Sequence, residues 1–145
     1  MIDIKYIREN PDEVVKRLAA KGYDATADVE NILSLDRERR TLISETDAFK
    51  AEQNRMTKLI PQYKKEGIDI SPVLRKMKEL SDSIKKNEEK LRYVEERFSS
   101  SMLVLPNLPD PDLLPGGKEN NQPLRYFGEV PKFDFEPKNH VDLCT

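Results

Sequence analysis

Apolar side chains recur every seven residues through the middle of the chain. One heptad position stays apolar for five successive repeats, which is typical of a long helix that packs along a second helix. The companion positions are partly polar, so the predicted apolar seam is narrow. We expect this helix to begin between Thr26 and Asp28. The repeat comprises Leu35, Leu42, Phe49, Met56 and Tyr63, and the companion positions hold Arg39, Thr46, Gln53 and Ile60.

A second helical pattern starts at Ser71, which can act as an N-cap, with Pro72 at the first helical position. Its seam positions alternate in steps of four and three, and seven of the nine are apolar. Asn87 is a polar member of this seam, of the kind that fixes the register of paired helices at some cost in stability. The nine positions hold Val73, Met77, Leu80, Ile84, Asn87, Leu91, Val94, Phe98 and Ser101.

Residues 64–72 connect the two helical patterns and include Gly67 as a turn signal. So short a connection makes the two helices antiparallel neighbours. At about 1.5 Å per residue, helices of roughly 30–38 residues extend about 45–57 Å, which is too long to fold back over residues 1–27. The pattern therefore predicts a two-helix coiled-coil arm over residues 28–101 that projects from a small body.

The body, residues 1–27, is expected to consist of short helices. Asn10 can cap a helix whose first residue is Pro11, and Gly22 can end that helix in a left-handed conformation. Asp3 can cap a shorter turn before it.

Pro61 conflicts with the helical pattern of the arm. A proline inside a helix removes one backbone hydrogen bond and its ring clashes with the preceding turn. We therefore expect a kink at Pro61 or a helix end near Ile60, with Tyr63 in an ordered tip.

The pattern changes after Ser101. Residues 102–123 are rich in Pro, Gly, Asn and Asp and predict an extended linker, whereas residues 124–130 alternate as a short strand would. The last residues stop in mid-pattern, so we expect the chain to be part of a longer protein. The predicted fold class is all-α, with an N-terminal arm domain over residues 1–101. A linker and the first short strand of a truncated second domain follow over residues 102–145.

Composition narrows the function classes. Charged residues make up 36% and apolar residues 37% of the chain, which suits two helices that share a thin apolar seam and expose their other faces to solvent. The net charge of −2 provides no overall basic field. The single cysteine cannot form an internal disulfide, the N-terminus lacks the apolar run of a signal peptide, and no stretch is long enough to span a membrane. We therefore expect a cytoplasmic protein.

The residue types of catalytic and metal sites do not cluster in the sequence. His140 is the only histidine, and a structural role suits it better than a catalytic one. Cys144 has no companion ligands for zinc. Gly116 and Gly117 predict a turn rather than a phosphate-binding loop. We therefore predict no catalytic residue, no metal site and no cofactor within these 145 residues.

Positive charge is concentrated in the distal part of the predicted arm. Residues 55–78 carry seven basic residues and only two acidic ones, whereas the two flanking parts of the arm are slightly acidic. A basic tip on a rigid helical rod suits the phosphate backbone of RNA, although a charged run on a helix is more often simply a solvated face. The predicted RNA contacts are Arg55, Lys58, Lys64, Lys65, Arg75, Lys76 and Lys78, with Arg39, Arg40, Lys85, Lys86 and Lys90 as secondary candidates nearer the base.

Several segments, in their order and spacing, closely resemble the N-terminal part of bacterial-type seryl-tRNA synthetases. The resemblance covers essentially the whole chain. It rests on MIDIKYIRENPDEVVKRLAAKG at the start, LDRERR at the arm base, AEQNRMTKLI midway to the tip, PNLPDPDLLPGGKENN in the linker and RYFGEVPKFDFEPKNHVDL near the end.

The resemblance implies an arm that binds the long variable arm and elbow of serine tRNA. It also implies a class II catalytic domain beyond residue 145, which uses ATP and magnesium to make seryl-adenylate and then transfers serine. In that family the tRNA bridges the two subunits of a homodimer. These 145 residues would then bind RNA without catalysing a reaction, and would be monomeric alone. The alternative is a coiled-coil module that dimerises or scaffolds without RNA, which should display a second apolar stripe; the sequence has none.

Overall fold

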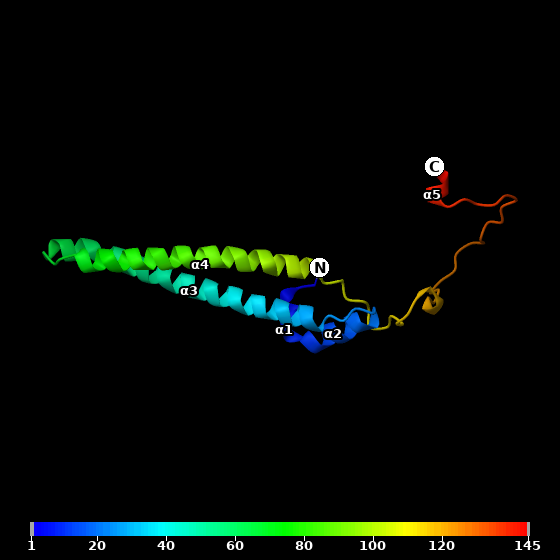
Figure 1. The fold of residues 1–145 in the computed structure, drawn as a ribbon, viewed down its shortest axis with the longest axis horizontal. Helices are drawn as coiled ribbons and strands as arrows, with labels where there is room; N and C mark the ends of the chain where they lie inside the picture. Colours follow the sequence, from blue (N-terminus) through cyan, green and yellow to red (C-terminus); the bar gives the residue numbers. More distant parts are fainter. Residues whose placement is uncertain (1, 145) are drawn as a thin grey trace.

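The computed structural model describes residues 2–144, and their architecture is all-helical. Two long helices lie side by side as an antiparallel hairpin, and two short helices pack against the base of that hairpin (Figure 1). The remaining chain leads away from the body on the side opposite to the arm (Figure 1). The elements are α1 (Ile4–Glu9), α2 (Pro11–Ala20), α3 (Thr26–Lys65), α4 (Ser71–Val104), the short 3₁₀ helix η1 (Lys118–Asn120) and α5 (His140–Leu143).

The ends of α1 and α2 follow the local signals in the sequence. The Asp3 side chain accepts a hydrogen bond of 2.7 Å from the Lys5 backbone N–H and so caps α1. Pro11 begins α2, and Gly22 follows it with a φ of 75°, a conformation that glycine adopts without strain. Asn10 occupies the N-cap position of α2, but its side chain bonds back to the Tyr6 carbonyl instead of capping the helix.

The apolar core of the body lies where α1 and α2 meet the base of the arm. Ile7, Val14 and Leu18 from the short helices are completely buried, and so is Ile32 from α3. The end of α4 closes this core with Met102, joined by Leu105 directly after the helix. The body therefore stabilises the arm at the end where its two helices are farthest from the connecting turn.

The hairpin seam consists of the residues that the heptad pattern predicts. All nine predicted positions of α4 are buried or half-buried. On α3, Leu35 and Leu42 are buried against Val94 of α4, whereas the distal positions Phe49 and Met56 are only half-buried. Packing is thus tightest near the body and looser toward the tip.

Helix α3 continues through Pro61 to Lys65, so of the two expected outcomes the helix end near Ile60 is wrong, and a kink at Pro61 stays a prediction. Pro61 leaves only one carbonyl without its helical donor, that of Thr57 four residues earlier. Thr57 is exposed, so water can satisfy this carbonyl. The helix needs only one further turn to reach its end, and Tyr63 lies half-buried in that turn.

The predicted cap of α4 is also displaced. Ser71 is the first helical residue and Ile70 the N-cap, with no capping bond from its side chain. Asp69 instead accepts a hydrogen bond of 2.9 Å from the Ser71 backbone N–H. An aspartate two residues before the helix thus satisfies one backbone donor at the start of α4, and the Ser71 side chain does not cap the helix.

The segment after α4 forms no strand within the described residues, so the predicted strand over residues 124–130 is wrong. Its apolar side chains are almost fully exposed, with Leu124 at 100% and Phe127 at 96%. A strand requires backbone hydrogen bonds to a neighbour, and no segment lies beside this one (Figure 1). The short helix α5 was not predicted.

Replacing Asn87 by leucine is expected to raise the free energy of unfolding by about 1 kcal/mol, because a buried apolar side chain fits the seam better than an amide. Asn87 is 9% exposed, and its Nδ2 donates to Glu45 Oε2 at 3.3 Å. Urea denaturation followed by circular dichroism measures the change, with Asn87→Ala as the destabilising control. An Asn87→Leu chain that unfolds at lower urea than the parent would show that the amide bond outweighs the packing gain.

Candidate nucleic-acid interface

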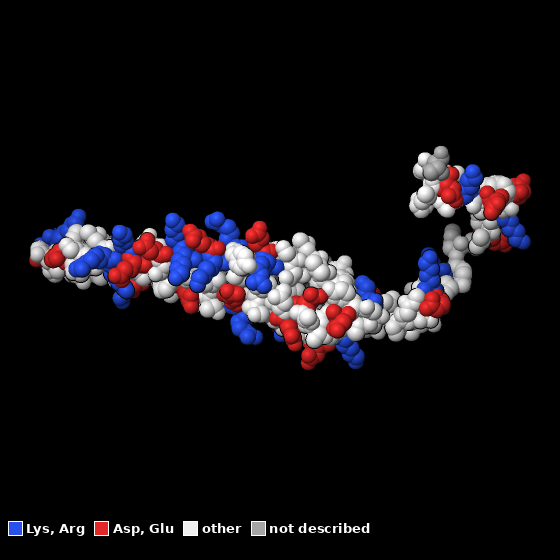
Figure 2. Space-filling view, in the orientation of Figure 1, with Lys and Arg blue, Asp and Glu red and all other residues white. Residues whose placement is uncertain are grey.

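The seven predicted tip residues are all exposed, and the fold brings them to the far end of the arm. The last turns of α3 carry four of them and the first turns of α4 carry three (Figures 1 and 2). On α3 they are Arg55, Lys58, Lys64 and Lys65, and on α4 they are Arg75, Lys76 and Lys78.

The two acidic residues of the tip are occupied by local hydrogen bonds. Asp69 accepts from Ser71 at the start of α4, and these bonds hold the pKa of its carboxyl below the usual value. Glu66 accepts a bond of 2.9 Å from the Gln62 side chain. Both acids therefore serve the connecting turn, and neither makes an ion pair with a tip lysine or arginine among the described residues.

Most of the tip cations have no ionic partner among the described residues. Arg55 pairs with Glu52 at 3.0 Å and Lys76 with Glu79 at 3.5 Å, both on the same helix. Such exposed pairs are weak and exchange readily for another anion. Between residues 2 and 144, no salt bridge engages the other five, which are Lys58, Lys64, Lys65, Arg75 and Lys78.

A buried carboxylate at the base of the arm holds three arginines. Asp36 is 1% exposed and its oxygens lie 3.5 Å from Arg8 of α1, 3.5 Å from Arg39 and 3.0 Å from Arg40. The bond to Arg8 joins the body to α3. The sequence analysis did not predict this cluster. A usable signal was present, because Asp36 follows the seam residue Leu35 and has arginines three and four residues later.

Two of the secondary candidates are therefore committed to the base of the arm. Arg39 pairs with Asp36, and its guanidinium carbon lies 5.0 Å from the ring centre of Phe98 on α4, a cation–π contact between the two helices. Arg40 donates to the same carboxylate. The other secondary candidates, Lys85, Lys86 and Lys90, are exposed on α4.

The first residues after α4 are bound to the body by two cationic side chains. Arg17 of α2 donates from Nε to the Pro109 carbonyl at 3.0 Å and from Nη1 to the Tyr6 hydroxyl at 3.4 Å. Lys21 donates to the Asn107 carbonyl at 3.1 Å. The packed structure thus extends through Pro109.

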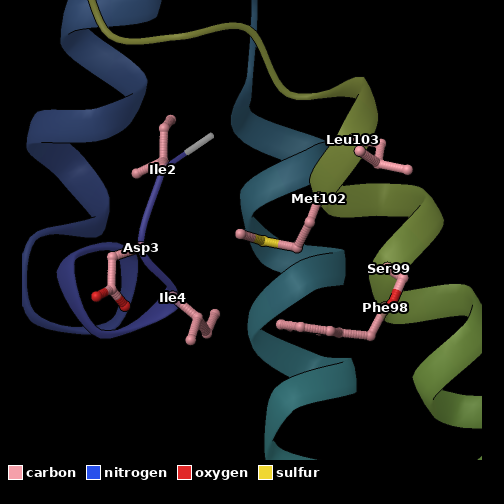
Figure 3. A pocket seen from close by; sticks show the side chains of 7 residues that line it. All are labelled: Ile2, Asp3, Ile4, Phe98, Ser99, Met102 and Leu103. Carbon is pink, nitrogen blue, oxygen red and sulfur yellow. The ribbon is translucent and has the colours of Figure 1, made fainter.

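A hollow of about 620 Å³ lies between the N-terminal segment and the end of α4 (Figure 3). Its lining is mostly apolar, and the Asp3 carboxylate within it already caps α1. The described residues contain no group of three His, Cys, Asp or Glu side chains able to hold a metal ion. No helix in the described part is long and apolar enough to cross a membrane. The hollow is lined by Ile2, Asp3, Ile4, Phe98, Ser99, Met102 and Leu103.

The fold defines an all-helical arm domain, in which a small body supports a long hairpin with a basic far end. The sequence profile of the seryl-tRNA synthetase N-terminal domain matches residues 1–109. The chain belongs to this family.

Curated relatives and a solved structure agree with this assignment. Serine–tRNA ligase of Clostridium tetani is 40% identical over 99% of the chain, and serine–tRNA ligase 2 of Clostridium acetobutylicum is 40% identical over all of it. Seryl-tRNA synthetase from Pyrococcus horikoshii, solved in complex with ATP, superposes with a TM-score of 0.78 and 28% identity over 99% of the chain. The chain spans 34% of the length of the two Clostridium relatives and 37% of the Pyrococcus structure.

Proposed function

We propose that this chain is the tRNA-binding arm of a serine–tRNA ligase and that it holds the long variable arm and elbow of serine tRNA. The observation that carries the proposal is the exposed excess of positive charge over residues 55–78, at the far end of an arm of this family. The seven tip residues would contact RNA phosphates.

The physical basis is the release of counterions. Each phosphate that a lysine or arginine neutralises frees condensed cations, so a few exposed cations provide substantial but salt-sensitive affinity. A stiff hairpin suits the shape of a double-stranded RNA arm, whose sequence is hard to read through its deep major groove. The tip would therefore recognise the RNA by its backbone and shape.

The activity of the whole protein is part of the same proposal. The longer protein would be a class II ligase that uses ATP and magnesium to activate serine, with all catalytic residues outside these 145 residues. It would be a cytoplasmic homodimer in which tRNA bound by one arm reaches the active site of the other subunit. The separate arm domain over residues 1–101, followed by a linker and the start of the catalytic domain over residues 102–145, belongs to this proposal.

The alternative function is dimerisation or scaffolding through the hairpin. It would need a second apolar stripe, because pairing of α3 with α4 uses the first. The exposed large apolar residues of the arm are few and spread along its sequence: Ile43 at 36%, Ile68 at 47%, Leu74 at 49% and Tyr93 at 60%. So few exposed apolar residues favour the RNA-binding function. Sedimentation equilibrium distinguishes RNA binding from scaffolding, because a tight dimer joined through residues 35–98 would support scaffolding.

Changing Lys64, Lys65, Arg75 and Lys76 together to alanine is expected to weaken binding of serine tRNA at least about tenfold at ~0.15 M salt. The slope of log affinity against log salt is negative, and its magnitude should decrease by about 3, because up to four phosphate contacts are lost. Filter-binding titrations at several salt concentrations measure both quantities.

The matched control removes the same charge from the segment that follows the body. Its four exposed cations Lys118, Arg125, Lys132 and Lys138 are changed to alanine instead. If the tip variant binds with the affinity and salt slope of the parent chain, the tip does not contact the RNA. If both variants lose affinity equally, the effect is one of net charge alone.

A further inference from the structure

One face of α4 carries basic and neutral polar residues but no acidic residue over four turns. Its members follow each other in steps of three and four residues, which places them along one side of the helix. The four acidic residues between Ser83 and Arg97, which are Glu88, Glu89, Glu95 and Glu96, lie off this line. We call it the α4 stripe, and it consists of Ser83, Lys86, Lys90, Tyr93 and Arg97.

The stripe contains an exposed aromatic ring held by a cation. Tyr93 is 60% exposed, and the guanidinium carbon of Arg97 lies 5.6 Å from its ring centre. The similar contact of Arg39 with Phe98 differs, because there both side chains are half-buried at the base of the seam. The Tyr93 ring is thus oriented by a neighbour while much of its surface remains open to solvent.

The cations of the stripe are available to an external anion. None of the salt bridges within residues 2–144 includes Lys86, Lys90 or Arg97. Glu45, an acidic residue of α3, accepts a hydrogen bond from the side-chain amide of Asn87 and so is engaged in the seam. The face drawn in Figure 2 shows lysine and arginine side chains gathered over the middle of the arm as well as at its tip.

We infer that the α4 stripe is a second RNA-binding surface, in which Tyr93 stacks on an unpaired base while Lys86, Lys90 and Arg97 contact the adjacent phosphates. This inference rests on the proposed function and assigns it a site distinct from the tip. Aromatic rings bind bases through their faces, and arginine provides planar donors for phosphate. The stripe would thus recognise a nucleotide whose base is not stacked in the RNA helix. Phosphate contacts at the tip cannot distinguish such a nucleotide from a stacked one.

Replacing Tyr93 by alanine in the 145-residue chain is expected to weaken binding of a serine tRNA transcript about tenfold, within the range for loss of one stacked base. The salt slope should stay the same, because no charge is removed. Tyr93→Phe keeps the ring and should bind within about twofold of the parent. Because Tyr93 is exposed, thermal melts of both variants should match that of the parent.

A charge-matched pair of double variants tests the phosphate contacts of the stripe. Lys90→Ala with Arg97→Ala removes two stripe cations, and Arg37→Ala with Arg92→Ala removes two exposed cations that lie off the stripe and are not predicted RNA contacts. The first pair should weaken binding several-fold more than the second. Equal affinity of Tyr93→Ala and parent, in a chain that does bind the tRNA, overturns the stripe and leaves the tip proposal intact. A parent chain that does not bind the transcript overturns both.

Discussion

Replacing Asp36 by alanine is expected to lower the free energy of unfolding by about 3 kcal/mol. Asp36 is the most buried charged side chain between residues 2 and 144, and it faces arginines from both α1 and α3. Without the carboxylate these arginines retain their positive charge beside an empty, poorly hydrated space. The arginines are partly exposed, so the cost lies near the lower end of the range for a broken buried ion pair.

The consequence of this substitution should extend to the direction of the arm. The Asp36–Arg8 contact is an ionic link between the body and α3, while Arg39 also contacts Phe98 on α4. Urea denaturation measures the stability, and a spin-label distance between α2 and the arm measures the direction. Asp36→Asn is the isosteric control and should lose less, because an amide still accepts a hydrogen bond. A stability change below about 0.5 kcal/mol for Asp36→Ala would show that the cluster is energetically neutral.

Replacing Ile32 by alanine is expected to lower the free energy of unfolding by about 3–4 kcal/mol, because it leaves a cavity in the core of the body. Ile32 is completely buried where the body meets α3. The exposed Ile43 on the same helix is the matched control, since it is 36% exposed and its truncation should cost less than about 1 kcal/mol. Equal losses from the two substitutions, measured by thermal and urea unfolding, would mean that the body core does not dominate stability.

The existence and pairing of the two long helices could be predicted from the sequence, because each narrow apolar repeat needs a partner helix and the short connection over residues 64–72 places the two helices side by side. The predicted seam positions of α4 are all buried or half-buried, and Gly22 takes the predicted left-handed conformation. The exposed basic tip also follows from sequence, since the short connection between the helices places residues 55–78 at one end.

Other features depended on competition between local signals and their surroundings. Pro61 was considered able to end α3 near Ile60, but the helix continues to Lys65. The proline lies about one turn from the helix end, and the Thr57 carbonyl that it leaves without a donor belongs to an exposed residue. Residues 124–130 have strand-like alternation, yet alternation alone provides no partner for backbone hydrogen bonds. The base cluster was missed because heptad reasoning treats Asp36 as one more polar position.

The sequence by itself determined a long antiparallel hairpin on a small helical body, with its charge excess at the tip, because periodicity and helix length are local properties of the chain. The tertiary structure alone decided which charges are already used and which remain available. It buries Asp36 among three arginines, binds the chain as far as Pro109 to the body, and leaves Tyr93 and its neighbouring cations on an open face of α4. The reason is that the burial of Asp36, its contact with Arg8 and the contact of Arg17 with Pro109 depend on where separate elements meet, which spacing within one helix does not give.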